Sequence, residues 1–315
     1  QLSQGDKKRC ALQWWDIRPQ DEICNALSIS ERTFNRWTKH KRLEKAKQEK
    51  QHVNALWLSC HTQEEIADIV GISRQSVTGI VQNATAGQMA EGGKLDNPQI
   101  YTVWNFPKLT NETKVFGSIP QEILDNLLYY YTKPFDVVFD PFAGGGMTID
   151  VCAKRKRRYY VSDLTPLIAR EDEIRQWDIT DGLPTDLPVP DLVFLDPPYW
   201  KQAQGKYSQK NTDIANASLE MFLDTIGNIA RDIKRKWKHG LADTHLALII
   251  GLYKNEGQYI DLPFLCYERI AKYLKLEVRI QVPYSTQVHG GKFVEMAKKN
   301  RELLYLSRDL MVFRQ

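Results

Sequence analysis

The chain has 315 residues, 42% of them hydrophobic, which is enough for about two domains with a sizeable core. It contains no apolar run long enough to span a membrane and no signal-peptide pattern, so the sequence excludes a membrane partner and favours a cytoplasmic location. The formal net charge of +4 is mild, and the five scattered cysteines favour reduced thiols and no metal site. Gln1 is not a start methionine, which favours a chain with residues missing upstream.

Residues 1–83 have a helical pattern with an internal repeat. Apolar and capping residues recur at a constant offset of 43, and each copy resembles a helix-turn-helix unit. We expect a tight turn at Ser28 or Gly71, followed by a second helix that Ser30 or Ser73 caps. A plain helical bundle is the alternative. The other equivalent pairs are Ile23 and Ile66, Cys24 and Ala67, Leu27 and Val70, Phe34 and Val77, and Trp37 and Ile80.

The second helix of each unit is the one expected to read DNA, because its early exposed positions face the major groove in proteins of this type. Residues 39–50, between the copies, are mainly basic, and phosphate contact explains this run better than a solvated helix face. The candidate DNA-binding residues are Arg32, Thr33, Arg36, Lys41 and Arg42 in one copy and Arg74, Gln75, Ser76 and Thr78 in the other.

Residues 84–99 are small, polar and rich in glycine, which predicts a linker, and a second domain follows over residues 100–315. In that domain, helical and strand patterns alternate, which predicts an α/β fold with a mostly parallel sheet. The expected helices cover residues 121–131, 219–238 and 262–274, and another helix follows the glycine turn at residues 141–148 and runs through Cys152. The expected strands cover residues 136–140, 159–163, 192–195, 244–251 and 276–284, with a strand pair at 303–306 and 310–313.

A glycine-rich turn follows the first of these strands, which ends at Asp140. A strand, a glycine turn and a helix form a seat for a cofactor, because glycines allow close approach and the helix N-terminus offers free N–H groups. Asp163 ends the next strand, 23 residues after Asp140, where an acid is placed to bind a pair of ribose hydroxyls. The cationic run at residues 154–158 complements the dipole at the helix exit, so it receives no active-site role.

The segment Asp196-Pro197-Pro198-Tyr199 follows a buried strand. The prolines lack backbone N–H groups, so the strand must stop there and leave main-chain carbonyls without partners. Ligands bind at the carboxyl ends of strands in open parallel sheets. A carboxylate, a free carbonyl and an aromatic ring at that edge can hold an exocyclic amino group and stack its base. For this short motif alone, a surface turn in which Tyr199 only packs is the alternative.

Together the motifs resemble motifs I, II and IV of the amino-methyltransferases that modify adenine N6 or cytosine N4 in DNA, over about residues 100–315. The resemblance implies S-adenosylmethionine as cofactor and a seven-stranded, mostly parallel, Rossmann-like methyltransferase sheet whose last strand is antiparallel. It also implies a cofactor-binding role for Asp178, with Asp172 and Asp181 as competitors, and for Phe116 in a motif X segment. The full cofactor set is Asp140, Pro141, Phe142, Ala143, Gly144, Gly146, Thr148, Asp163, Asp178 and Phe116.

By the same resemblance, Asp196, Pro197, Pro198 and Tyr199 are catalytic. The order of motifs is that of the family's gamma class, although that class more often has Asn where this chain has Asp196. No large target-recognition domain follows, so we assign target reading to the helix-turn-helix pair. The loop at residues 201–216 is expected to close over the target nucleotide, with a simple solvated loop as the alternative.

The function favoured by this sequence is adenine-N6 methylation of double-stranded DNA, because Asp at the start of motif IV fits adenine enzymes better than the Ser common in cytosine-N4 enzymes. The base must be flipped out of the duplex to be reached. A cytosine-N4 enzyme, an RNA base methyltransferase and a catalytically silent DNA-binding regulator remain as alternatives, in that order. We expect a bacterial, archaeal or phage-type protein that is a monomer or a homodimer.

Overall fold

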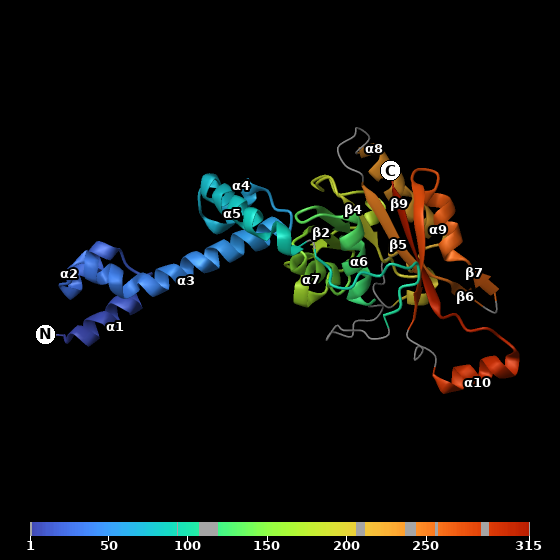
Figure 1. Ribbon diagram of the computed structural model, residues 1–315, viewed down its shortest axis with the longest axis horizontal. Helices are drawn as coiled ribbons and strands as arrows, with labels where there is room; N and C mark the ends of the chain where they lie inside the picture. The colour runs from blue at the N-terminus through green and yellow to red at the C-terminus, as the bar shows by residue number, and fades with distance from the viewer. Residues whose placement is uncertain are drawn as a thin grey trace. The chain divides into compact units, whose positions relative to one another are not determined.

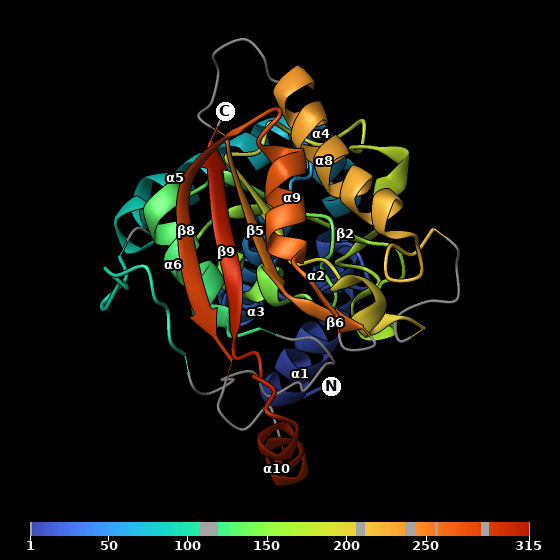
Figure 2. The ribbon, with the colours of Figure 1, turned by 90° about the vertical axis from the view of Figure 1, so that its right-hand side faces the viewer.

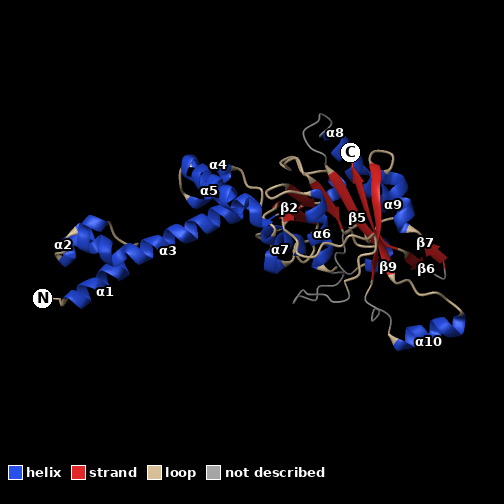
Figure 3. Cartoon of the chain, viewed as in Figure 1, coloured by secondary structure: helices blue, strands red, loops and turns tan. Residues whose placement is uncertain are grey.

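The computed structural model describes residues 2–92, 94–106, 119–205, 212–236, 244–255, 258–284 and 290–314. The chain divides into two compact units, one of residues 1–57 with 62–82 and the other of residues 58–61 with 83–315 (Figure 1). The first unit is helical, and the second holds the sheet (Figure 3). None of the described helices is both long enough and apolar enough to cross a lipid bilayer.

The helical unit repeats its local geometry at the offset seen in the sequence. Ser28 and Gly71, which end the short helices, both have left-handed backbones, with φ of 49° and 73°. The Oγ of Ser30 accepts from a backbone N–H of the next helix at 3.2 Å, and the Oγ of Ser73 does so at 3.1 Å. The helices are α1 (Gln4–Trp14), α2 (Gln20–Leu27), α3 (Glu31–Leu58), α4 (Gln63–Val70) and α5 (Arg74–Gly92).

Each copy has its own small apolar core. In the first copy, Ile23 and Phe34 are buried together with residues of α1. In the second, the equivalent Ile66 and Val77 are buried with the end of α3. The sequence repeat is therefore also a repeat in structure, and the equivalent apolar positions are those that each copy buries.

The observed boundaries between the units differ from the expected ones in two places. Helix α5 continues to Gly92, so the first half of the expected linker at residues 84–99 is helical; this segment contains no proline, and most of its residues are compatible with a helix. Residues 58–61 belong with the second unit. Cys60 is buried in the same apolar cluster as Phe139, and Arg175 donates to the carbonyl of Ser59 at 3.0 Å.

The second unit is built on a sheet of seven strands in the order β3-β2-β1-β4-β5-β9-β8. Strands β5, β9 and β8 lie side by side in Figure 2. Only β9 runs antiparallel to its neighbours, which confirms the predicted sheet. The strands are β1 (Val137–Asp140), β2 (Arg158–Asp163), β3 (Arg175–Gln176), β4 (Leu192–Leu195), β5 (His245–Gly251), β8 (Lys275–Pro283) and β9 (Ser307–Arg314), and a separate hairpin pairs β6 (Tyr253–Asn255) with β7 (Gln258–Ile260).

The central strands are apolar because both faces of the sheet are covered. Successive residues of β1, β4 and β5 alternate between two apolar clusters, one on each face. One cluster contains residues of α6 (Gln121–Tyr131) and α7 (Met147–Lys154), and the other contains residues of α8 (Leu219–Lys236) and α9 (Leu262–Ile270). Short 3-10 helices lie at Ile168–Arg170 (η1), Ile179–Asp181 (η2) and Trp200–Ala203 (η3).

The C-terminal part differs from the predicted strand pair. Residues 303–306 form no strand: Leu303 is 86% exposed, and the Tyr284 N–H donates to the carbonyl of Leu306 without a continuing ladder being assigned. Instead β9 alone fills the gap between β5 and β8. A helix that was not predicted, α10 (Gly291–Asn300), precedes it, and α9 ends four residues earlier than expected.

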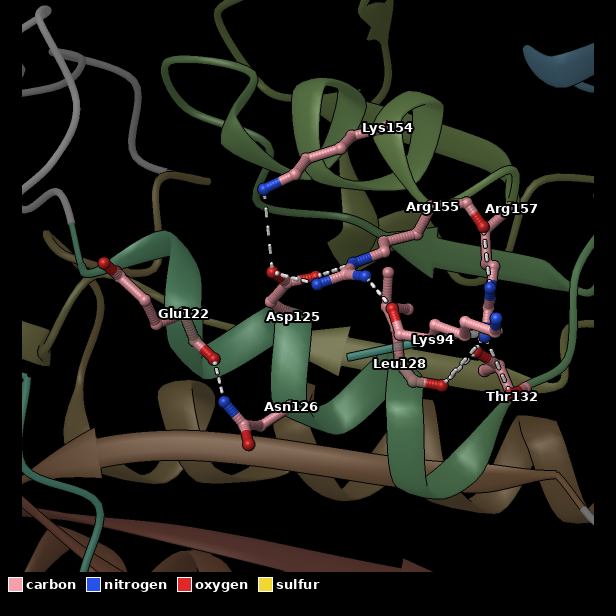
Figure 4. Close-up of polar contacts among 9 residues, drawn as sticks. All are labelled: Lys94, Glu122, Asp125, Asn126, Leu128, Thr132, Lys154, Arg155 and Arg157. Carbon is pink, nitrogen blue, oxygen red and sulfur yellow. Dashed lines mark hydrogen bonds and ion pairs between the residues drawn. The ribbon is translucent and has the colours of Figure 1, made fainter. Parts of the chain in front are cut away.

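The cationic run after α7 holds this helix to α6 (Figure 4). Arg155 forms an ion pair with Asp125, in which Nη2 donates to Oδ2 at 2.8 Å. The fully buried Arg157 donates to the Oγ1 and the carbonyl of Thr132, both at 2.9 Å, and to the carbonyl of Leu128 at 3.2 Å. These bonds satisfy carbonyls at the end of α6, so the run has a structural use.

Candidate active site

The two sequence motifs meet at one edge of the sheet. Strands β1 and β4 are parallel neighbours, with Phe139 paired to Val193. Asp140 is the last residue of β1, and Asp196 directly follows the last residue of β4. The carboxyl groups are close enough that the charge of Asp140 raises the pKa of Asp196. Both motifs therefore open at the carboxyl end of the sheet, where parallel sheets bind ligands.

Asp140 organises the glycine turn. Its carboxylate is buried and accepts from the backbone N–H of Phe142 at 2.9 Å and from the Oγ1 of Thr148 at 2.5 Å. Desolvation raises the pKa of Asp140 to about 7, while these two hydrogen bonds oppose the rise. The side chain thus joins the strand to the turn and to the first turn of α7, and its role here is to shape the cofactor seat.

The turn itself needs glycine at two positions. Gly144 and Gly146 have left-handed backbones, with φ of 49° and 79°. A Cβ on Gly146 would lie 2.5 Å from Nη1 of Arg170, whose guanidinium donates to the Gly146 carbonyl at 2.9 Å and to Asp150 at 2.7 Å. Arg170 was not among the predicted residues, and no spacing rule indicates it.

Asp163 lies beside the turn at the end of β2. Its Oδ2 accepts from the N–H of Gly144 at 2.9 Å and its Oδ1 from the N–H of Thr165 at 2.9 Å, which fixes the carboxylate. Each oxygen keeps a second lone pair for a further donor. Burial raises the pKa of Asp163, and the two backbone bonds oppose this. Asp178, next along this edge, caps η2 by accepting from the N–H of Thr180 at 3.0 Å.

The double-proline segment forms a tight, anchored turn. Tyr199 has φ −74° and ψ 69°, the values of an inverse γ-turn, and Trp200 N–H donates to the Pro198 carbonyl at 2.6 Å. Trp200 has a positive φ of 42° and is held by a 2.9 Å bond from Nε1 to the Ala217 carbonyl and by an edge contact with Tyr253. The anchor fixes where Asp196 and Tyr199 point.

Two acceptors in this turn carry no protein donor. Within the described part of the chain, neither the Asp196 carboxylate nor the Pro197 carbonyl has a hydrogen bond or ion pair. Desolvation raises the pKa of Asp196 to about 7, the positive charge of Arg308 lowers it, and Asp140 raises it. Acceptors that are largely removed from water and have no donor are costly unless a ligand supplies one, and here Pro197 is buried and Asp196 partly buried.

Three further residues lie at this site and were not predicted. Gly251 ends β5, and a Cβ there would lie 2.8 Å from the hydroxyl of Tyr284 and 3.3 Å from the ring of Tyr199. Arg308, at the start of β9, pairs with Gly251 and stacks on the Tyr284 ring at 4.5 Å. These residues are distant from the motifs in sequence, so only the strand register brings them together.

Other predicted residues lie elsewhere. Phe116 and the middle of the expected loop, residues 206–211, are outside the described residues. In the second helical copy, Gln75 and Ser76 are exposed, whereas Arg74 pairs with Glu64 at 2.9 Å and Thr78 is partly buried.

In the first helical copy, Arg32 and Arg36 are exposed and Thr33 is partly buried. Lys41 and Arg42 each form a hydrogen bond within the helical unit. Lys41 donates to the carbonyl of Leu12 and Arg42 to the side chain of Gln20, both at 2.8 Å.

Comparison with known families places this fold and site in a class. A family model, N6_N4_Mtase, described as a DNA methylase, matches residues 18–171. This match covers just under half of the chain and supports kinship with the adenine-N6 and cytosine-N4 DNA methyltransferases. The matched stretch includes the glycine turn and Asp163 and ends before Asp196. A comparison with curated proteins gave no match.

Two of the solved structures that resemble the chain are a protein from Galdieria sulphuraria named as a sarcosine dimethylglycine methyltransferase and LepI in complex with SAM. The first is 14% identical, with a TM-score of 0.36, over 62% of this chain and 84% of its own. The second is 12% identical, with a TM-score of 0.32, over 99% of this chain and 95% of its own. Likeness at this level carries no argument, so the fold rests on the strand order.

Proposed function

We propose that this protein is a site-specific DNA adenine-N6 methyltransferase that uses S-adenosylmethionine and acts on an adenine flipped out of double-stranded DNA. The observation that carries the proposal is the pair of donor-free acceptors, the Asp196 carboxylate and the Pro197 carbonyl, at the same edge as the glycine turn. An exocyclic amino group has two hydrogens, and these two acceptors match them.

The residues of the glycine turn fit S-adenosylmethionine. Asp163 is held by two backbone N–H groups and retains acceptor capacity for both ribose hydroxyls. The left-handed Gly144 and Gly146 keep the wall of the seat free of side chains. When bound, this cofactor supplies a methyl group activated by the adjacent positive sulfur. Asp178, further along the same edge, is our candidate for a contact to the adenine of the cofactor.

The chemical problem at the acceptor side is that an aromatic amino nitrogen is a poor nucleophile, because its lone pair is delocalised into the ring. Acceptance of both amino hydrogens by Asp196 and Pro197 draws the nitrogen toward a tetrahedral geometry in which the lone pair is available. The carboxylate charge also offsets the positive charge that develops on nitrogen during transfer. Tyr199 is our candidate for stacking on the base.

The base assignment is tested by the product. We expect digestion of DNA treated with the protein and labelled S-adenosylmethionine to give N6-methyl-2′-deoxyadenosine in nucleoside chromatography. N4-methylcytosine would overturn the choice of base and favour the second candidate, which uses the same two acceptors. Competition with structured RNA should not reduce transfer to duplex DNA. Asp196→Ala should abolish transfer while leaving DNA binding intact.

We further propose that the two helical copies read the DNA sequence. The support is their shared geometry, a short helix, a left-handed turn and a capped second helix, with Arg32, Arg36 and Gln75 exposed early on those second helices. Protection of a defined DNA site that is lost in Arg36→Ala and Gln75→Ala variants would support this role. Unchanged site preference in both variants would refute it.

A further inference from the structure

One face of the sheet carries both Asp196, which follows β4, and Arg308, at the start of β9. Phe194 and Ile249 belong to the same apolar cluster as Leu310. Because side chains alternate along a strand, Asp196 lies on the face of Phe194, and Arg308 lies on the face of Leu310. The strand between them, β5, ends in Gly251, which pairs directly with Arg308.

Because Gly251 has no side chain, Tyr199 and Tyr284 can both approach β5 at this position. A Cβ on Gly251 would lie 2.8 Å from the Tyr284 hydroxyl and 3.3 Å from Cε2 of Tyr199. The first distance is closer than real Cβ contacts allow. Tyr199, in the double-proline turn, and Tyr284, at the end of β8, therefore both lie against Gly251, and the approach of Tyr284 requires glycine there.

Arg308, which stacks on Tyr284, lies in an environment that is unusual for an arginine. It is 6% exposed, and its Cζ lies 4.5 Å from the centre of the Tyr284 ring. Its Nε has no hydrogen-bond partner within the ranges that the structure describes, whereas a side-chain contact of Arg308 with the Tyr199 hydroxyl opposes the rise in the pKa of that hydroxyl. Buried charges are stable when an opposite charge lies near. The carboxylate whose pKa Arg308 lowers is that of Asp196, although the two are not in contact as an ion pair.

We propose that Arg308 is a positioning residue for methyl transfer: its guanidinium, stacked on Tyr284, keeps Asp196 in the ionised form that accepts from the target amino group. This inference rests on the proposed function. A protonated carboxyl would present a donor to the amino group, so the ionised form is the one that works. Arg308 acts through Asp196 and does not itself touch the reacting atoms.

Several charged and titratable groups around Asp196 influence whether its carboxyl group is protonated or ionised. Asp140 faces it from β1 and Arg308 from β9, while Tyr199 from the same turn and Tyr284 from the end of β8 lie alongside. Desolvation and Asp140 raise the pKa of Asp196 to about 7, and Arg308 is the nearby group that lowers it. Removal of Arg308 leaves only the influences that favour protonation.

The test measures the pH dependence of methyl transfer for Arg308→Met, Arg308→Lys and the unaltered protein. We expect the acid limb of the rate profile to move to higher pH by about one unit or more in Arg308→Met, as loss of an opposite charge nearby predicts. The rate at low pH should then fall about tenfold or more, with a smaller loss at high pH. Arg308→Lys should largely restore the original profile.

The matched control is Arg279→Met. Arg279 lies on β8, on the opposite face, and pairs with Asp309 at 2.8 Å, so its loss should leave the acid limb in place. A uniform loss of rate in Arg308→Met without movement of the limb would overturn the inference, because a merely structural role predicts that result.

A second readout needs no turnover. Carbon-13 NMR of carboxyl-labelled aspartate, with Asp196→Asn to assign the signal, should show the Asp196 titration midpoint move upward in Arg308→Met. An unmoved midpoint overturns the inference even in an active enzyme. Absence of methyl transfer in the unaltered protein, with the NMR shift present, would instead refute the proposed function alone.

Discussion

Asp196→Asn should make the fold more stable at neutral and alkaline pH while it removes activity. The pKa of Asp196 is raised from 3.8 to about 7 in the folded chain, chiefly by desolvation. The unfolded chain therefore loses its proton at lower pH than the folded one. The free energy of unfolding falls as the pH rises from about 4 to about 7, and the full penalty of the charge is present above that range.

The size of the effect follows from the difference of about three pH units between the two pKa values. At 1.36 kcal/mol for each unit, the upper limit is about 4 kcal/mol. Asp196 is partly accessible to water, and the new amide also needs hydrogen bonds, so a gain of about 1–3 kcal/mol is more realistic. For a domain of this size, that corresponds to a rise in Tm of roughly 2–9 °C at pH 8.

Thermal unfolding of both proteins from pH 5.5 to pH 8.5 measures this rise in Tm. The Tm difference between Asp196→Asn and the unaltered protein should already be about half of its full size at pH 5.5 and should grow until about pH 7. The matched control is Asp309→Asn, since Asp309 is equally close to the sheet edge but pairs with Arg279 at 2.8 Å; this variant should be less stable at every pH. A difference for Asp196→Asn that stays constant across the range, or a lower Tm at pH 8, would refute the reasoning.

Three further predictions concern ligand binding. Gly146→Ala should weaken S-adenosylmethionine binding about tenfold or more in calorimetry, because φ at Gly146 is 79° and the new Cβ would lie 2.5 Å from Arg170. The control is Gly290→Ala, which should leave binding unchanged, because φ at Gly290 is −65° and no atom lies near the new Cβ. Asp163→Asn should weaken cofactor binding by roughly 10- to 100-fold without changing DNA affinity. Joint replacement of Arg32 and Arg36 by Ala should reduce the salt dependence of DNA binding by about two phosphate contacts, while the exposed Lys272→Ala should not. Equal salt slopes in these two variants would contradict the assignment.

The parts of the fold that sequence patterns predicted well are those with strong local signals. Strand β4 and helix α6 match their predicted ranges, because an unbroken apolar run bounded by acids and an apolar pattern at helical spacing leave few alternatives. The offset of 43 between the helical copies also reappears in structure. The predicted strand at residues 303–306 was wrong, since an apolar run alone does not show which residues find a neighbouring strand.

The candidate site was predicted only where it follows a motif. Asp140, Asp163 and Asp196 each end a predicted strand, and parallel strand order brings such residues together. Gly251 and Arg308 have no such signal. Their contact depends on the register of β5 with β9, which local patterns do not contain.

The same register explains why an antiparallel strand matters at a site formed by parallel ones. In each parallel strand, the last residues lie at the carboxyl edge of the sheet, where the site is. Strand β9 runs in the opposite direction, so its first residues lie at that edge. The sheet can therefore add a buried cation beside Asp196 without a loop, and Arg308 is supported on both sides by Gly251 and Val282. A rigid strand holds a charge more firmly than a loop does, so we expect the electrostatic environment of Asp196 to be set before DNA binds.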